Sequence, residues 1–565
     1  MRRTYRKKKP AANITLTVVD VDTVRVKTRK LEAGVLKALK AACHVDDKRK
    51  TFDIQWTALN TLREFAHNLT VEDIPRHVLM VRPRARRDKV QIPFCSDRVP
   101  AILWDTLFPY QREGVRASFE QYGGRVLMAD DMGLGKTRQA LSFIAHCLPA
   151  RVLVICPSYL RYHWCHELTL WLSMAPQIVK KGSDKLIGET CIVSYDMLHS
   201  LAIPTGMFDV VVCDESHYVK SRKTKRTKAT VPLVKSARAA MLVTGTPALN
   251  RPIELFSQLM MLRPIYIRNY TAYAARYCNG KCTPFGYDDR GSSNSHELNW
   301  VLTNGFMVRR LKRDVLTQLP PKTRHTVWLE VKASLLTDVE DGFRRWRELN
   351  ETLYKLPSGS EQQRKQMFDR QSVISELFRL TSVAKCEAIA TWVLNALNDG
   401  REFIFFAYHR IVLDAVEEAV SGAGFGYMRI DGSTPAVKRQ QNVEEFQNDS
   451  SIKIAILSLM AAGTGVTLTR VSECVFGELY WVPGVMIQAE DRVHRISQTE
   501  RVDIHYLLGT ETLDTYVHPS LCTKLATLDV VIDQRADRTF KGATTTNVPV
   551  EEDDSLLKII SKMVS

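Results

Sequence analysis

The stretch VLMADDMGLGKT (126–137) decides the fold expected for this chain. Its apolar start is typical of a buried strand, and the helical pattern RQALSFIAHCL follows at 138–148. A strand, a glycine-containing loop and a helix N-terminus in this order form a cradle for phosphate groups. The simpler interpretation is a glycine turn between a core strand and a core helix.

Individual residues of the loop have separate predicted tasks. Gly133 and Gly135 allow backbone N–H groups to turn towards an anion, Lys136 reaches the β- and γ-phosphates, and the Thr137 hydroxyl can hold Mg²⁺. Asp130 stands where the general phosphate-loop pattern has its first glycine. The predicted nucleotide contacts within the loop are Asp131, Met132, Gly133, Leu134, Gly135, Lys136 and Thr137.

Bulk properties limit the classes of protein. The 565 residues suffice for three or four domain-sized units, with 45% hydrophobic and 25% charged residues, as in ordinary globular proteins. A net charge of +17 favours a polyanionic partner, nucleic acid first. No apolar run is long enough to span a membrane, and no secretory signal is visible. The scattered 12 cysteines suit reduced thiols, and Cys278 and Cys282 lack a second pair that would complete a zinc site.

Strand-like and helix-like patterns alternate on both sides of the middle of the chain, which predicts parallel sheets covered by helices. In such sheets the functional loops follow the carboxyl ends of the strands. Asp214 and Glu215 close one strand, where they are placed to hold Mg²⁺ through water and to activate a water molecule. The predicted strands are 151–157, 190–196, 208–215 and 239–247, then 401–408, 426–433, 452–459, 473–481 and 502–508.

Gln111 lies upstream, in LFPYQREGV (107–115). Its amide can donate to and accept from an adenine edge, and the rings of Phe108 and Tyr110 can pack near a base. Without a nucleotide the same stretch is a helix start with Pro109 in its first turn.

The second half has no phosphate loop of its own but contains QAEDRVHRISQ (488–498). On a helix, Arg492 and Arg495 would share one face. Two arginines aimed at a γ-phosphate stabilise charge in the transition state of hydrolysis. The alternative is a solvated basic helix face.

Several motifs together resemble the Swi/Snf-type branch of superfamily 2 helicases. They are LMADDMGLGKT (127–137), DESH (214–217), TGTPALNRP (244–252) and ELYWVPGVMIQAED (478–491). RYCNGKCTPFGYDDRGSSN (276–294) and FMVRRLKRDVLTQLPPK (306–322) are similar to the annealing-helicase, fork-remodelling subgroup; by pattern alone they are a surface loop and a basic amphipathic helix. Ser497 replaces the glycine usual in this family, which leaves the position of Gln498 open.

The resemblance implies a two-lobed motor that uses ATP and Mg²⁺ and binds DNA mostly through phosphates. Gly465, in MAAGTGVTL (460–468), would contact the nucleotide. The implied DNA-binding residues are Pro157, Ser158, Ser194, Tyr195, Thr244, Gly463, Thr464 and Thr467.

The expected fold class is α/β, with two RecA-like lobes, helical protrusions between them and a small N-terminal α/β module faintly similar to the HARP module of annealing helicases. The expected divisions are a basic tail 1–12, the module 13–81, a basic linker 82–99, lobe one 100–265, helical protrusions 266–395, lobe two 396–515, closing helices 516–541, and a linker with an amphipathic helix 542–565. That last helix docks on the body or on a partner protein.

The expected function is that of an ATP-dependent double-stranded DNA translocase, monomeric and nuclear, or cytoplasmic or nucleoid in a viral or bacterial relative. It would anneal strands or remodel branched DNA. Two alternatives remain: a motor of the same build that acts on chromatin or polymerases, and a DNA-binding scaffold with an inactive motor. One assay of ATP turnover with and without DNA separates the scaffold from both motors.

Overall fold

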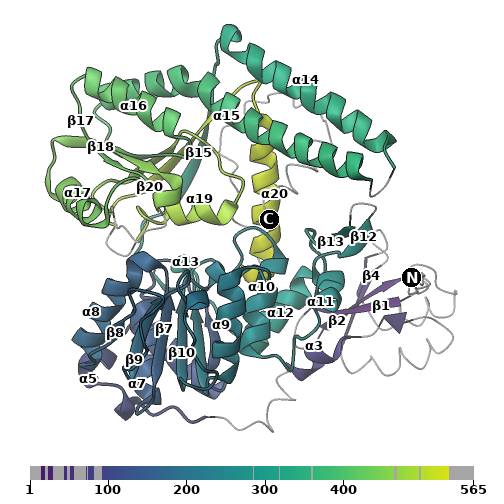
Figure 1. Ribbon diagram of the computed structural model, residues 1–565, viewed down its shortest axis with the longest axis vertical. Helices are drawn as coiled ribbons and strands as arrows, with labels where there is room; N and C mark the ends of the chain where they lie inside the picture. Colours follow the sequence, from purple (N-terminus) through teal and green to yellow (C-terminus); the bar gives the residue numbers. More distant parts are fainter. Residues whose placement is uncertain are drawn as a thin grey trace.

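The structure is a computed structural model of residues 14–19, 23–28, 44–46, 51–55, 71–72, 74–81 and 92–533, without 284–285, 317, 358–359, 463–467 and 496–497. Several predictions lie outside these residues. They concern the basic tail, parts of the N-terminal module and of the basic linker, the 463–467 turn and everything after residue 533. Figure 1 shows lobe one below lobe two, with the N-terminal strands to one side of lobe one.

Lobe one is built on a parallel seven-stranded sheet of order β14-β6-β11-β10-β7-β9-β8. Its central strands are continuous runs of apolar residues buried on both faces, as expected for a sheet covered by helices. The four strands predicted here are confirmed. The strands are β6 (Arg125–Met128), β7 (Val152–Cys156), β8 (Gln177–Ile178), β9 (Thr190–Ser194), β10 (Val210–Asp214), β11 (Ala239–Val243) and β14 (Met307–Val308).

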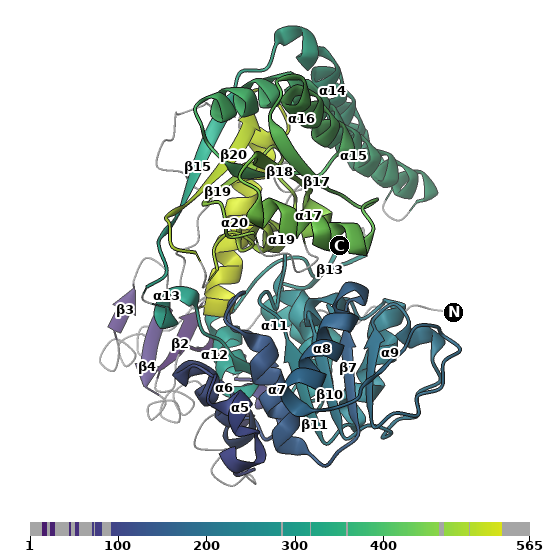
Figure 2. The same cartoon turned by 90° about the vertical axis from the view of Figure 1, so that its left-hand side faces the viewer.

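Helices cover both faces of this sheet, as Figure 2 shows from the side. They are α5 (Ala101–Trp104), α6 (Pro109–Glu120), α7 (Lys136–Cys147), α8 (Arg161–Leu172), α9 (Lys225–Ser236) and α10 (Leu255–Leu262). Short 3₁₀ turns stand at η2 (Ser96–Arg98), η3 (Ser158–Leu160), η4 (Leu198–Ser200), η5 (Ser216–Val219) and η6 (Pro252–Glu254).

Lobe two has a parallel six-stranded sheet of order β15-β20-β19-β16-β18-β17. All five strands predicted for it are confirmed. Its strands are β15 (Lys322–Leu329), β16 (Phe403–Ala407), β17 (Gly426–Ile430), β18 (Ile452–Ser458), β19 (Glu473–Phe476) and β20 (Val502–Gly509). Its helices are α16 (Arg410–Gly422), α17 (Ala436–Asn448), α18 (Leu459–Ala462) and α19 (Pro483–Glu490).

Two expectations for the middle of the chain are wrong. The segment 306–322 is not one amphipathic helix, because Met307 and Val308 pair with β6 as an edge strand and only α13 (Lys312–Val315) is helical. The protrusion 266–395 is not wholly helical, because β15 forms an eight-residue ladder with β20 and belongs to the sheet of lobe two. Both strands find their partners far away in sequence, so local periodicity does not reveal them.

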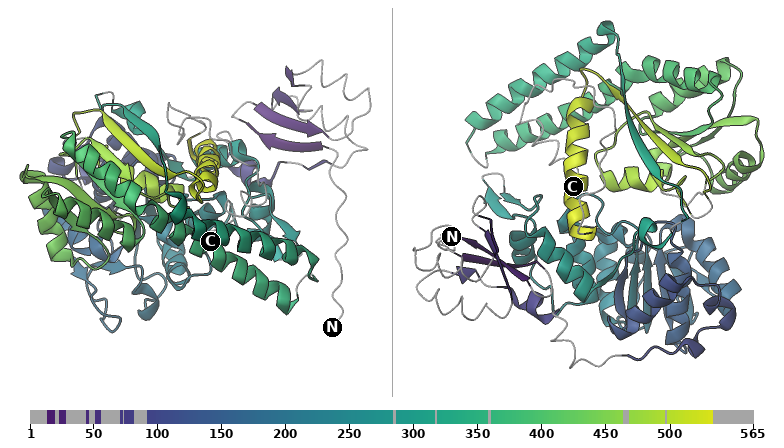
Figure 3. Two further views of the ribbon diagram at one scale, coloured as in Figure 1. Left: turned by 90° about the horizontal axis from the view of Figure 1, so that it is seen from above. Right: turned by 180° about the vertical axis from the view of Figure 1, so that it is seen from behind.

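Long helices project from lobe two and return the chain to lobe one. α14 (Ala333–Lys355) and α15 (Glu361–Asn398) pack together as a helical hairpin within the predicted helical protrusions. α20 (Asp514–Asp533) is one continuous helix that reaches from lobe two to lobe one, as the view from behind in Figure 3 shows. Asn299 Nδ2 donates to Val531 O (3.0 Å) and Ile532 O (2.9 Å) at its end.

The N-terminal module contains a five-stranded sheet of order β3-β4-β2-β1-β5 that docks on the segment between the lobes. Arg276 donates to Leu16 O (2.7 Å), and Val18 N donates to Glu297 Oε2 (3.1 Å). Its elements are β1 (Ile14–Val18), β2 (Thr23–Thr28), β3 (His44–Asp46), β4 (Thr51–Gln55), β5 (Val71–Glu72) and α3 (Arg76–Met80). It meets α11 (Tyr270–Tyr277) and α12 (Ser295–Gly305), which flank the antiparallel hairpin β12 (Lys281–Thr283) and β13 (Gly286–Asp288).

Candidate nucleotide site between the lobes

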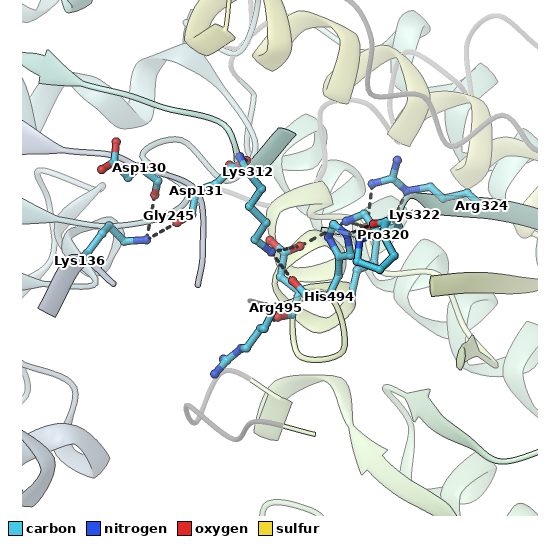
Figure 4. Close-up of polar contacts among 12 residues, drawn as sticks. Asp130, Asp131, Lys136, Gly245, Lys312, Pro320, Lys322, Arg324, His494 and Arg495 are labelled. Atoms are coloured by element: carbon cyan, nitrogen blue, oxygen red, sulfur yellow. Dashed lines mark hydrogen bonds and ion pairs between the residues drawn. The ribbon is translucent and has the colours of Figure 1, made fainter. Parts of the chain in front are cut away.

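The phosphate loop joins β6 to α7 with the predicted geometry. Gly133 and Gly135 have φ of +80° and +71°, in the left-handed region that a glycine adopts without strain. Lys136 Nζ donates to the carbonyl oxygens of Asp130 (2.8 Å) and Asp131 (2.9 Å), as Figure 4 shows. Burial lowers the pKa of Lys136, and the charges of Glu215, Asp130 and Asp131 oppose that effect. The lysine therefore stands at the loop, bound to groups that a phosphate oxygen can replace.

The contacts of Asp130 explain why an aspartate stands where the general phosphate-loop pattern has a glycine. Its side chain is fully buried, and its Oδ2 accepts from Gln139 Nε2 (2.9 Å) and pairs with Arg310 NH1 (3.2 Å). A glycine there would leave the Gln139 amide without this acceptor and remove the buried partner of Arg310. Asp130 thus fixes the start of the loop to α7 and to the segment after β14.

Gln111 holds the loop instead of presenting its amide to a base. Its Nε2 donates to Leu134 O (2.9 Å), and its Oε1 accepts from Phe108 N (2.9 Å). The Tyr110 hydroxyl donates to the same carbonyl of Leu134 at 3.2 Å. Gln111, predicted to contact adenine, thus lies beside the loop with its amide bonded to Leu134 and Phe108.

The end of β10 carries the predicted carboxylates. Asp214 accepts from Trp164 Nε1 (2.9 Å) and from the backbone N of Glu215 (2.9 Å). Glu215 has a φ of +49°, a conformation that costs a non-glycine residue free energy and that is enriched at functional sites. His217 Nδ1 lies 3.2 Å from both Glu215 Oε2 and Thr244 Oγ1. The DESH and TGTP motifs are therefore in direct contact.

The two carboxylates have different proton affinities. Burial, together with the negative charge of Glu215, raises the pKa of Asp214 to about 6. Burial also opposes ionisation of Glu215, but the hydrogen bond from His217 and the charges of Lys136 and Arg492 hold its pKa below the ordinary value. Glu215 is therefore the stronger acid of the pair and stays ionised to lower pH than Asp214.

Arg492 and Arg495 come from lobe two and face these groups, but not from a helix. α19 ends at Glu490, so the predicted helical placement of the two arginines is wrong: both lie in the turn that follows. Arg492 is 4% exposed, and its Nε has no hydrogen-bond partner among the described residues. Burial lowers the pKa of Arg492, and burial with the charge of Arg492 lowers that of Arg495 to about 9. Both cations gain from an anion at this place.

Contacts between the lobes bring the arginines to the phosphate loop. A Cβ placed on Gly133 would lie 3.6 Å from Cγ of Arg495. Figure 4 shows the Arg495 side chain extending from lobe two towards lobe one. Gln488 Nε2 donates to Thr246 Oγ1 (2.8 Å), and Gly484 N donates to Leu249 O (3.0 Å). Gln498, whose position was open, is buried and donates to Val471 O (3.0 Å).

Several of the side chains predicted to contact DNA are buried in the structure. Tyr195 is fully buried and its hydroxyl donates to Asp214 O (2.7 Å). Pro157, Ser194 and Thr244 are also buried, because strand-end residues of this sheet turn into the core, whereas Ser158 is exposed. Gly463, Thr464, Gly465 and Thr467 lie outside the described residues.

Sequence reasoning missed residues that support the site. Trp164 holds Asp214 from α8, and only a fold that brings β10 beside this helix reveals it. The basic run KSRKTKRTK (220–228) does have a sequence signal, its charge, and Arg222, Lys223, Lys225 and Lys228 are exposed. Arg226 lies 3.8 Å from Asp196, next to Tyr195.

The described residues contain neither a cluster of metal-binding side chains nor a helix suited to span a membrane. Among them, histidine, cysteine and acidic side chains do not gather in threes as a metal cluster, and Cys278 is buried while Cys282 is exposed. In the same residues, none of the helices has the length and apolarity needed to cross a membrane.

Comparison with known proteins agrees with this geometry. Residues 110–337 match the model of the SNF2-related domain, and residues 384–497 match the helicase conserved C-terminal domain. The chain is 31% identical over 551 residues to a Caenorhabditis elegans protein, "SWI/SNF-related matrix-associated actin-dependent regulator of chromatin subfamily A-like protein 1 homolog", covering 93% of this chain and 76% of the relative. The chain belongs to the SNF2-related family.

The chain is also similar to two further curated relatives, each over part of that relative's length. The Xenopus tropicalis "SWI/SNF-related matrix-associated actin-dependent regulator of chromatin subfamily A-like protein 1" is 36% identical, covering 88% of this chain and 53% of the relative. The Mus musculus "DNA annealing helicase and endonuclease ZRANB3" is 38% identical, covering 78% of this chain and 42% of the relative. The chain thus spans about half the length of these curated relatives.

Proposed function

We propose that this chain is an ATP-dependent translocase on double-stranded DNA that anneals complementary strands or remodels branched DNA. One observation carries the proposal: Lys136 and Glu215 of lobe one and Arg492 and Arg495 of lobe two converge on the phosphate loop. A DNA-binding scaffold has no need for buried, mutually facing charges of this kind. Their desolvation is unfavourable and is offset when a phosphate group enters.

The residues suggest how ATP would be hydrolysed. Lys136 exchanges the carbonyl oxygens of Asp130 and Asp131 for phosphate oxygens. Glu215, ionised and oriented by His217, accepts a hydrogen bond from the attacking water and takes its proton. Arg492 and Arg495 stabilise the charge that develops on the transferred phosphoryl group, and such arginines contribute roughly 10³–10⁵-fold to turnover in related nucleotidases.

The residues also fit Mg²⁺, the ion that the family implies. The Thr137 hydroxyl and the carboxylate of Asp214 are hard oxygen donors of the kind Mg²⁺ prefers. Burial and the charge of Glu215 raise the pKa of Asp214 despite the nearby charge of Lys136, so a bound cation would further stabilise its carboxylate. Thr137 and Asp214 would hold Mg²⁺, which when bound would supply positive charge against the β- and γ-phosphates.

We propose that DNA lies across the exposed side chains near the end of β9 rather than on the buried residues predicted from the sequence. Ser158 is exposed there, and the basic run at 222–228 follows Tyr218, which stacks on Tyr195 at 5.5 Å. Contacts of Lys and Arg with phosphates carry no base information, so sequence preference should be weak. The names of the relatives mention chromatin and DNA annealing, which supports a role in the nucleus and in strand annealing. We further propose that the chain works as a monomer.

ATP turnover on single-stranded, duplex and forked DNA tests the proposal. We expect DNA to stimulate turnover, forks most strongly, and Lys136→Ala to abolish it. Lys185→Ala, at an exposed lysine, is the matched control. Equal stimulation by plain duplex would indicate a general translocase, and turnover unaffected by any DNA would contradict the proposal.

The name of the Xenopus relative includes "regulator of chromatin", so nucleosomal DNA belongs in the same assay. Stimulation by nucleosomes above that by free duplex of equal length would favour a chromatin motor. Strand annealing measured on a bubble substrate coated with single-strand-binding protein separates the two motors directly.

A further inference from the structure

Residues 309–312 run from the end of β14 into the start of α13. They have no role in the proposed reaction, but Arg309 and Lys312 form several hydrogen bonds and ion pairs in the interface. Arg309 is nearly enclosed, with 5% of its side chain exposed. Its guanidinium lies 2.8 Å from Asp131 Oδ1 and 2.8 Å from Asp533 Oδ1 at the end of α20. It also donates to Ala129 O (2.7 Å) and Gly245 O (3.1 Å). Arg309 therefore ties Asp131 to the TGTP turn and to α20.

Lys312 extends from the same Asp131 in the opposite direction, into lobe two. Its backbone N donates to Asp131 Oδ2 (3.2 Å), and its Nζ lies 3.1 Å from Asp491 Oδ1. The ammonium also donates to His494 O, as Figure 4 shows. Asp491 directly precedes Arg492, and His494 directly precedes Arg495 in the chain. One lysine thus joins the phosphate loop to the turn that carries both arginines.

The same geometry places Lys312 and Arg495 side by side over the loop. A Cβ on Gly133 would lie 3.6 Å from Cε of Lys312 and 3.6 Å from Cγ of Arg495. Lys322, from the start of β15, supports the far side of the turn by pairing with Glu490 (2.7 Å) and Asp491 (3.3 Å). The turn is therefore held by two lysines, and Lys312 connects it to Asp131 of lobe one.

We propose that Lys312 is a positioning residue: it holds the arginine turn of lobe two at a fixed place over the phosphate loop, with Asp131 as its anchor and Arg309 fixing that anchor. The inference rests on the proposed function and deepens it. A preformed arrangement of cations lowers the reorganisation needed in the transition state, and a displacement of about 1 Å in such a group costs up to roughly 10²-fold in rate.

Lys312→Met removes the ammonium and keeps the aliphatic stem over Gly133. We expect DNA-stimulated kcat to fall roughly 10- to 100-fold. The Kd for a non-hydrolysable ATP analogue should stay within about threefold of wild type, since the bonds of the Lys312 ammonium go to Asp491 and His494 of lobe two. Lys312→Arg should recover most of the turnover. Arg313→Ala, at a neighbouring cation with a side chain 46% exposed, is the control that should leave kcat unchanged.

A double-mutant cycle separates positioning from a general structural effect. If Lys312 acts through the arginine turn, Lys312→Met should lower turnover little further in the Arg495→Ala background, because residues that act as a unit are not additive. Equal falls in both backgrounds would overturn the inference. A rise in the Kd for the analogue that accounts for the whole loss of activity would also overturn it.

Amide hydrogen exchange supplies a readout that does not need turnover. Lys312→Met should speed exchange in residues 489–495 while leaving β16 and β18 as protected as in wild type. Unchanged exchange at 489–495 would contradict the positioning role even if the wild type proved unable to hydrolyse ATP. Failure of the inference and failure of the proposed function are thus distinguishable.

Discussion

Trp164 donates a hydrogen bond of 2.9 Å from its indole Nε1 to Oδ2 of Asp214, from a side chain that is itself fully buried. This bond favours the ionised carboxylate and fixes its orientation. Groups that orient a metal-binding carboxylate in this way typically contribute 10–100-fold to metal affinity.

Trp164→Phe should therefore raise the Mg²⁺ concentration needed for half-maximal ATP turnover by about tenfold. Titration of turnover with Mg²⁺ at saturating ATP and DNA measures this directly. Trp171→Phe, on the same helix and partly buried, should leave the Mg²⁺ dependence unchanged. An equal shift in both variants would indicate general loosening of α8 instead of a role for the Trp164 bond.

Arg495→Ala should lower DNA-stimulated kcat by roughly 10³-fold or more, as expected for an arginine that stabilises the transition state. The Kd for a non-hydrolysable analogue should change far less, because the effect concerns charge that develops during the reaction. Arg501→Ala, at a side chain 57% exposed in lobe two, is the control. If Arg495→Ala weakens binding alone, the assigned role is wrong.

The two carboxylates and the two arginines show how much of the site could be predicted from the sequence. Spacing and residue type identified Lys136, Asp214, Glu215, Arg492 and Arg495, and the structure brings them together. The helix expected for the arginines was wrong because α19 ends at Glu490, which Lys322 and Arg324 of β15 bind from 166–168 residues away. Local periodicity contains no information about such pairs.

Several side chains predicted to contact DNA are buried for a related reason. β9 is buried on both faces, so its sequence has no alternation that would tell which strand-end side chains turn inward. Tyr195 was therefore assigned to the surface, although it lies in the core below Asp214. The two lobes themselves were predictable, because continuous apolar strands alternate with helical patterns along the chain. The edge strands β14 and β15 were not, since each is defined by its long-range partner.

The N-terminal module should separate from the motor when its buried ion pair is broken. Arg276 and Glu297 lie 2.8 Å apart with side chains 6% and 0% exposed, and they also bind the backbone of β1. Glu297→Gln removes the negative charge that balances Arg276, a change that costs about 3–5 kcal/mol at a buried site.

We expect faster amide exchange at Val18 in Glu297→Gln, whereas Glu340→Gln, at an exposed position on α14, should have no effect. Protection of β1 equal to that of wild type would show that other contacts dock the module.

Acid should weaken the same region. Burial lowers the pKa of His77 from 6.5 to about 4, with the charge of Glu297 opposing this effect and that of Arg276 adding to it. Between these values the unfolded chain binds a proton that the folded chain does not, so stability falls as pH decreases from 6.5 to about 4. Urea unfolding at several pH values should show a smaller slope in this window for His77→Gln than for wild type. Identical slopes would contradict the assignment.

The central claim is that the two lobes form one ATP-hydrolysing site that DNA stimulates. ATP turnover by wild type and Glu215→Gln, each with and without forked DNA, tests it most directly. We expect forked DNA to stimulate turnover by the wild type strongly. Glu215→Gln should lose turnover but still bind the non-hydrolysable analogue. Wild-type turnover in Glu215→Gln would contradict it.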